Sequence, residues 1–107
     1  MEDFHPIFGE FKKEFPRIHE MYEALGKEIH ENSGPLDEKT SQLIQLAAAA
    51  AIRSEGSVHS HVRRARAAGA SPEEVYHTLI LLTSTIGFPT TSAALSWAYD
   101  LMRQEAD

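Results

Sequence analysis

A chain of 107 residues without cysteine has the length of a single domain and can form no disulfide, thiolate metal site or thiol nucleophile. Its formal net charge of −6 argues against a general binder of nucleic acids or anionic membranes. The first residues lack a basic start followed by an apolar run, and the longest apolar run, residues 46–52, is too short to span a bilayer. We therefore expect one domain, residues 1–107, in the cytoplasm.

The first half of the chain is expected to be helical. Residues 6–32 place apolar side chains three and four positions apart, which predicts an amphipathic helical segment that is bent or broken near Pro16. The amphipathic stretch belongs to an N-terminal helical segment, residues 1–34. This segment ends at the helix breaker Asn-Ser-Gly-Pro of residues 32–35. Asp37 then offers a side-chain acceptor for a helix that continues through five alanines until Gly56 ends or kinks it. The alanines permit close helix packing, as in a tight bundle or a subunit interface.

The second half of the chain predicts three more helices. Residues 57–68 form a short helix that Gly69 stops. The sequence Ser-Pro-Glu-Glu at 71–74 has the pattern of a capping box and opens a helix that runs to about Ile86. After a break at Gly-Phe-Pro, a last helix covers residues 90–105. No alternation of period two is visible, so we expect an all-α, compact bundle of about five to six helices.

The stretch RSEGSVHSH at 53–61 carries the candidate chemistry. Ser54, Ser57 and His61 share one face of a helix, and Ser57 and His61 are close enough in such a helix to form a hydrogen bond. A Ser–His pair can begin nucleophilic catalysis, but it also needs an orienting carboxylate and an oxyanion site. The sequence identifies neither, and the alternative is a serine that only hydrogen-bonds a buried histidine.

The same stretch contains three possible ligands for a divalent metal. Glu55, His59 and His61 are of types that suit zinc, iron or manganese. His59 and His61 point to nearly opposite sides of a regular helix, so they converge only if Gly56 unwinds the segment or two subunits contribute. Acid–base work by His61 with Glu55 or His59 is a further option. We expect His77, within an apolar helix, to be a core histidine.

Residues 36–99 resemble the carboxymuconolactone decarboxylase and AhpD-like (alkylhydroperoxidase-like) superfamily. The resemblance is carried by the helix start Leu-Asp-Glu-Lys-Thr at 36–40, by His61, Ala65 and Gly69, and by the Pro-Glu-Glu that follows at 72–74. It implies an AhpD-like helical bundle that assembles into a homo-oligomer, typically a trimer or hexamer, and that takes a small-molecule ligand.

In the AhpD-like branch, two cysteines separated by two residues reduce hydroperoxides, and a histidine and an upstream glutamate relay protons. The resemblance places Ser54 and Ser57 at the cysteine positions, His61 at the histidine and Gln42 at the glutamate. A serine hydroxyl cannot form a mixed disulfide, and an amide cannot accept and return a proton as a carboxylate does. The decarboxylase branch tends to have a glutamate four residues before the histidine, where Ser57 stands.

Three functional hypotheses follow from these residues together with what the resemblance implies about substrate and activity. In the first, a pocket centred on His61 binds a small lactone or carboxylate, catalyses acid–base chemistry and has no thiol peroxidase activity, with Arg53 or Arg63 available to pair with the charge of the substrate. The pocket residues in this hypothesis are His61, Ser57, Ser54, Gln42, His59 and Glu55. In the second, the chain is a metal-binding or non-catalytic oligomer. In the third, the two serines replace the cysteines of an AhpD-like peroxidase and inactivate it.

Overall fold

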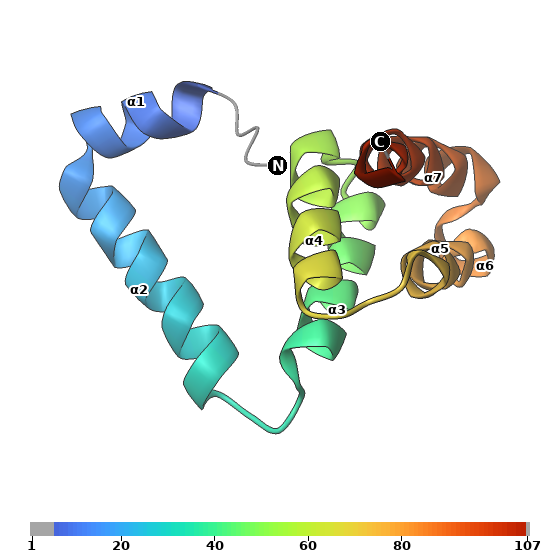
Figure 1. Cartoon of the computed structure of the whole chain (residues 1–107), viewed down its shortest axis with the longest axis horizontal. Coiled ribbons are helices and arrows are strands. Elements are labelled where there is room, and N and C mark those ends of the chain that lie inside the picture. The colour runs from blue at the N-terminus through green and yellow to red at the C-terminus, as the bar shows by residue number, and fades with distance from the viewer. Residues whose placement is uncertain (1–5, 107) are drawn as a thin grey trace. The chain divides into compact units, whose positions relative to one another are not determined.

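A computed structural model of the chain describes residues 6–106, with side chains to residue 105, and confirms the all-α class (Figure 1). Within these described residues there are seven α-helices, one 3₁₀-helix and no strand. The helices are α1 (Pro6–Glu14), α2 (Pro16–Asn32), α3 (Glu38–Ala51), α4 (Glu55–Ala67), α5 (Pro72–Ile80), α6 (Thr83–Ile86), α7 (Phe88–Met102) and η1 (Arg103–Ala106). Since α6 is one turn long, six α-helices exceed a single turn. No described helix is both long and apolar enough to cross a membrane.

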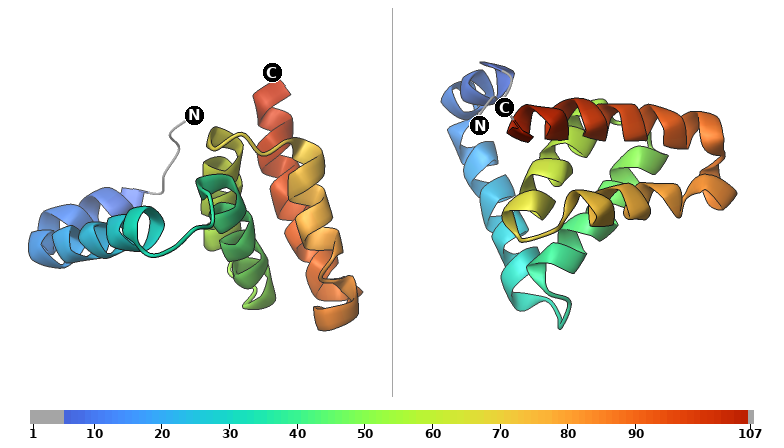
Figure 2. Two further views of the ribbon diagram at one scale, coloured as in Figure 1. Left: turned by 90° about the horizontal axis from the view of Figure 1, so that it is seen from below. Right: turned by 45° about the vertical axis from the view of Figure 1, so that its right-hand side comes forward.

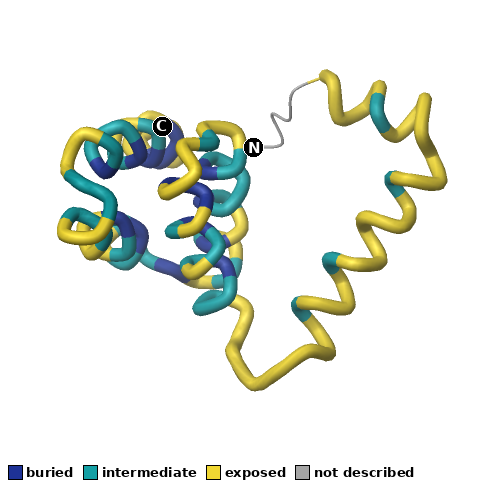
Figure 3. The backbone as a smooth tube through the Cα atoms, turned by 180° about the vertical axis from the view of Figure 1, so that it is seen from behind, coloured by how far each residue is buried: buried dark blue, intermediate teal, exposed yellow. Residues whose placement is uncertain are grey.

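The chain divides into two units, residues 1–35 and 36–107, at the predicted breaker. The N-terminal unit contains α1 and α2, which are separated at Phe15 because Pro16 starts the second helix. The rings of Phe11 and Phe15 lie 5.8 Å apart across this junction. None of residues 6–32 is buried, and Figure 3 shows both helices almost entirely in the colour of exposed residues. This unit therefore lacks a core of its own.

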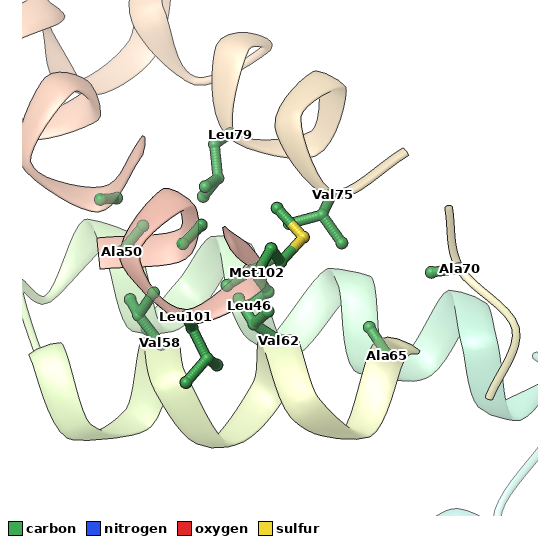
Figure 4. Close-up of a cluster of buried hydrophobic side chains, with 13 residues drawn as sticks. Leu46, Ala50, Val58, Val62, Ala65, Ala70, Val75, Leu79, Leu101 and Met102 are labelled. Carbon is green, nitrogen blue, oxygen red and sulfur yellow. The ribbon is translucent and has the colours of Figure 1, made fainter. Parts of the chain in front are cut away.

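The C-terminal unit contains the hydrophobic core. Helices α3 and α4 form an antiparallel pair, α5 and α7 lie side by side, and each of the two pairs contacts the other (Figure 2). Figure 4 shows side chains from both pairs meeting in the interior. Full burial of one valine or leucine side chain stabilises a fold by about 1.5–3 kcal/mol. The buried apolar residues are Leu46, Ala49, Ala50, Val58, Val62, Ala65, Ala70, Val75, Leu79, Ala94, Ala98, Leu101 and Met102.

The boundary between α3 and α4 lies earlier than the sequence predicts. Helix α3 ends at Ala51, and Gly56 lies inside the first turn of α4 instead of breaking the chain. The reversal is made by Arg53, which has a φ of 60°. The Arg53 N–H donates to Ala50 O and the Ser54 N–H to Ala49 O, both at 3.0 Å. These two bonds form a Schellman motif, in which glycine is the usual left-handed residue.

The later helices confirm the predicted cap of α5 but not every predicted helix boundary. The capping box at Ser71 and Glu74 is present on α5. Helix α5 stops at Ile80, and a turn separates it from α6, so the single helix expected to reach Ile86 is two pieces. Helix α7 begins two residues before the predicted start, after Gly87 with a φ of 90°, and ends at Met102 in a 3₁₀ turn. His77 is exposed, so its prediction as a core histidine is wrong.

The capping box makes the stability of the fold depend on pH. The pKa of Glu74 lies below its ordinary value of 4.5, first because the Ser71 N–H donates to the carboxylate and then because Lys39 Nζ does so at 3.0 Å. A carboxyl group with a lowered pKa in the folded state stabilises the protein fully above its unfolded pKa. That contribution is lost as the pH falls through the folded pKa.

We predict that Glu74→Gln is less stable than wild type above pH 5 and that this difference shrinks towards pH 3, because glutamine does not ionise. Urea unfolding followed by the fluorescence of Trp97 measures it. Glu73→Gln is the matched control, since Glu73 is an exposed carboxylate in the same turn that takes no part in the capping box. A Glu74→Gln difference that is constant from pH 7 to pH 3 would contradict the prediction.

Candidate functional site

Ser54 and Ser57 lie at the start of α4, where they fix the beginning of the helix. Ser54 is the N-cap residue, and its Oγ accepts the Ser57 N–H at 3.4 Å. A hydroxyl at this position satisfies one of the backbone donors that the first turn of a helix leaves unpaired. Both serines are partly buried. The Ser54 oxygen therefore already has a structural partner.

His61, one turn further along α4, is held by a side chain of α3. Its Nδ1 lies 2.8 Å from Oε1 of Gln42, whose side chain is almost completely buried at 2% exposure. Nε2 of the same glutamine donates to Glu38 Oε2, also at 2.8 Å. The three side chains form a hydrogen-bonded triad, Glu38–Gln42–His61, that runs along α3 and crosses to α4. The structure thus brings Gln42 and His61, two of the predicted pocket residues, into direct contact.

The triad determines which nitrogen of His61 carries a proton. An ionised carboxylate only accepts hydrogen bonds, so the amide of Gln42 must turn its NH₂ group towards Glu38. Its carbonyl oxygen then faces His61 and can only accept, which requires a proton on Nδ1 of the ring. In the neutral imidazole the lone pair is consequently on Nε2. A general base needs such a lone pair, and the amide fixes the tautomer that supplies it.

Glu55 and His59, which the sequence predicts in the same pocket as His61, are not part of the triad. Glu55 and His59 pair with each other one turn apart on α4, with Oε2 and Nε2 at 3.9 Å. The His59 side chain is 27% exposed and that of Glu55 is 59% exposed. Among the residues that the structure describes, no group of three or more histidine, aspartate or glutamate side chains could hold a metal ion. One chain therefore does not gather Glu55, His59 and His61 into a ligand set.

Glu38 is the member of the site that the sequence reasoning missed. In the sequence it stands in the helix start Leu-Asp-Glu-Lys-Thr, and in the structure it is the acidic residue in the first turn of α3. The signal was available in its spacing, because Glu38 precedes Gln42 by four residues and such residues are neighbours on a helix. The link from Gln42 to His61 spans 19 positions and depends on how α3 packs against α4.

Two of three comparisons with known proteins name the same family. Residues 16–100 match the model of the carboxymuconolactone decarboxylase family. A crystal structure of an apo carboxymuconolactone decarboxylase family protein from Legionella pneumophila superposes with a TM-score of 0.79 at 26% identity, over 94% of this chain and 88% of that one. A Haemophilus influenzae protein described as uncharacterized is 40% identical over 58 residues, which is 54% of this chain. The match covers 50% of that curated relative, so this chain corresponds to about half of its length.

The triad predicts a measurable tautomer at His61. In wild type, ring ¹⁵N shifts recorded at a pH where the imidazole is neutral should report the Nδ1–H form. Gln42→Leu should lose this preference because the acceptor is gone, and the loss of hydrogen bonding should lower the free energy of unfolding by about 1 kcal/mol. Gln42→Glu should keep the preference, since a carboxylate also accepts. The exposed ring of His77 is the internal control. An unchanged His61 tautomer in Gln42→Leu would show that Gln42 does not set it.

Proposed function

Because this chain belongs to the carboxymuconolactone decarboxylase family, we propose that it catalyses acid–base chemistry on a small lactone or carboxylate at a site centred on His61. The observation that carries the proposal is the hydrogen-bonded triad, which presents His61 with its lone pair on Nε2. Histidine titrates near neutral pH and is the side chain most often used for general acid–base catalysis. The resemblance supplies the substrate class, and the triad supports the role of the histidine.

The triad also suits the charged form of the ring. When Nε2 takes a proton from a substrate, the imidazolium keeps its Nδ1–H bond to Gln42 Oε1. The carboxylate of Glu38 lies behind the amide and favours the positive charge through it. The amide holds both protonation states without moving a proton itself. Glu38 and Gln42 thus act as positioning residues, and His61 is the catalytic residue of this proposal.

The other candidate residues have supporting roles in the proposal. Ser57 stands one turn before His61 and offers a hydroxyl that can hydrogen-bond a substrate oxygen, while Ser54 keeps the start of α4 in place. Glu55 and His59, which pair with each other, adjoin the site and can donate or accept a second proton. Arg53, exposed immediately before the cap, is available to a substrate carboxylate. A carboxylate on the substrate would therefore improve binding at this end of α4.

Thiol peroxidase activity is not part of this proposal, because the chain has no cysteine. We further propose that the chain forms a homo-oligomer, because the family that it resembles typically forms trimers or hexamers. Its cytoplasmic location stays a prediction from the sequence.

The proposal is tested with a panel of γ-lactone carboxylates that includes 4-carboxymuconolactone, incubated in D₂O and followed by NMR. Wild type should accelerate decarboxylation, ring opening or deuterium exchange next to a carbonyl for at least one member. His61→Gln should reduce that rate by about 10²–10⁴-fold, the usual contribution of a general acid or base. His77→Gln is the matched control, since His77 is exposed on α5. No turnover of any member, or full activity in His61→Gln, would refute the proposal.

A second experiment tests whether the fold still supports the thiol chemistry of the AhpD-like branch. Wild type should consume no tert-butyl hydroperoxide above background in the presence of dithiothreitol. The triple variant Ser54→Cys/Ser57→Cys/Gln42→Glu should gain measurable consumption, because a helix N-terminus lowers the pKa of a thiol. The two thiols would reduce the hydroperoxide to alcohol and water, and dithiothreitol would reduce the resulting disulfide. Adding His61→Ala should abolish the gain; a folded but inactive triple variant would contradict the expected site geometry.

A further inference from the structure

We propose that the apolar stripe of α2 docks onto the outer face of α3 in a second copy of this chain. The α2 stripe consists of Ile18, Met21, Tyr22, Leu25 and Ile29, and the α3 outer face consists of Ile44, Ala48, Ala51 and Ile52. The proposal identifies the two surfaces that meet in the homo-oligomer proposed above, and it rests on that assembly. It is independent of the chemistry proposed for His61.

The α2 stripe has the pattern of a buried helix face but is open to solvent. At ~100° per residue, its five side chains fall within an arc of about 100°. Each of them is between 51% and 66% exposed. None of residues 6–32 is buried, and a lone helix of about 17 residues is only marginally stable in water. A partner surface is therefore needed to hold α2 in its helical form.

The exposed area is sufficient for a specific protein interface. A fully buried aromatic side chain contributes about 150–250 Å², so a large apolar side chain that is half exposed offers roughly 100 Å². Ile7, Phe8 and Phe15 are also more than half exposed in the N-terminal unit. These three lie outside the α2 stripe, which by itself offers about 500 Å². In a two-fold arrangement each copy also contributes its α3 outer face, so each partner approaches the ~800 Å² of an interface of standard size.

Helix α3 supplies the matching surface because it is apolar on two sides. One side faces the core through Leu46, Ala49 and Ala50. The other side is the α3 outer face, whose four residues also fall within about 100°. Ile44 is 51% exposed, Ile52 is 74% exposed, and both alanines are exposed. A helix that is apolar all round is normally buried all round, and alanine lets a second helix approach closely.

Charge favours a copy of this chain as the occupant. Helix α2 carries four glutamates against one arginine and one lysine. The α3 outer face ends beside Arg53. Helices α3 and α4 with the turn between them, residues 38–67, carry two glutamates against one lysine and four arginines. Two copies of a chain with a net charge of −6 meet most easily where an acidic segment faces a basic one. Since each copy has both surfaces, a two-fold arrangement forms the contact twice.

The absence of cysteine from the chain gives a clean cross-linking test. Leu25→Cys and Ala48→Cys are made separately in full-length chains of different tag length, mixed, and oxidised. We expect a disulfide-linked heterodimer on a non-reducing gel, and light scattering should show a mass above that of one chain. Glu23→Cys replaces Leu25→Cys as the matched control, because Glu23 lies ~200° around α2 from Leu25. This control should give no link to Ala48→Cys.

A double variant, Leu25→Cys/Ala48→Cys, distinguishes the alternative occupants. A monomer closed by a disulfide within one chain would overturn the proposal and assign the α3 outer face to α2 of the same chain. Homodimers of Leu25→Cys without heterodimers, or a wild-type mass of one chain, would also overturn it. Because these readouts need no substrate, their failure is distinct from a failure of the lactone assay. The Leu25→Glu variant should have a smaller oligomeric mass than wild type. If that variant unfolds, the cross-links between the cysteine variants still test the contact, because they do not depend on it.

Discussion

The buried amide of Gln42 has to satisfy a donor and an acceptor at the same time, and the site is organised around this requirement. Leaving either end unpaired inside the protein costs about 1–3 kcal/mol. The pairing with Glu38 on its own helix and with His61 on the next one removes that cost. It also links α3 to α4, because the carbonyl oxygen of Gln42 on α3 accepts a hydrogen bond from the ring of His61 on α4. The same contact that stabilises the helix pair therefore orients the imidazole.

The alanines of α3 make this arrangement possible. Ala49 and Ala50 are buried among the core residues, and small side chains let α4 lie close enough for Gln42 to reach His61. The opposite side of the same helix carries Ala48 and Ala51, which are exposed in the single chain. One run of alanines thus serves two purposes in our account. It brings α4 to the site on one side and leaves a shallow surface for a second copy on the other.

Local signals in the sequence predicted much of the fold but only part of the site. The caps at Asp37 and Ser71 were predictable because each depends on residues within four positions. The turn at Arg53 was not predictable from the sequence. A left-handed conformation is usually expected at glycine, and here an arginine adopts it. The family resemblance located His61 and Gln42 together, whereas Glu38 required the observed side-chain contacts. The exposure of His77 depends on which side of α5 faces the core, and an apolar run does not indicate that side.

An amide in place of a carboxylate also changes how the site responds to acidity. In a site with glutamate at this position, the carboxylate and the imidazole would exchange protons with solvent as a coupled pair, with apparent constants that belong to neither group alone. Gln42 carries no ionisable proton, so it separates His61 from Glu38 by a neutral link of two hydrogen bonds. The ring can then gain or lose its proton beside a partner whose own charge never changes. The hydrogen-bond partner of the ring on α3 is therefore neutral at every pH, and this is the physical consequence of that one side chain.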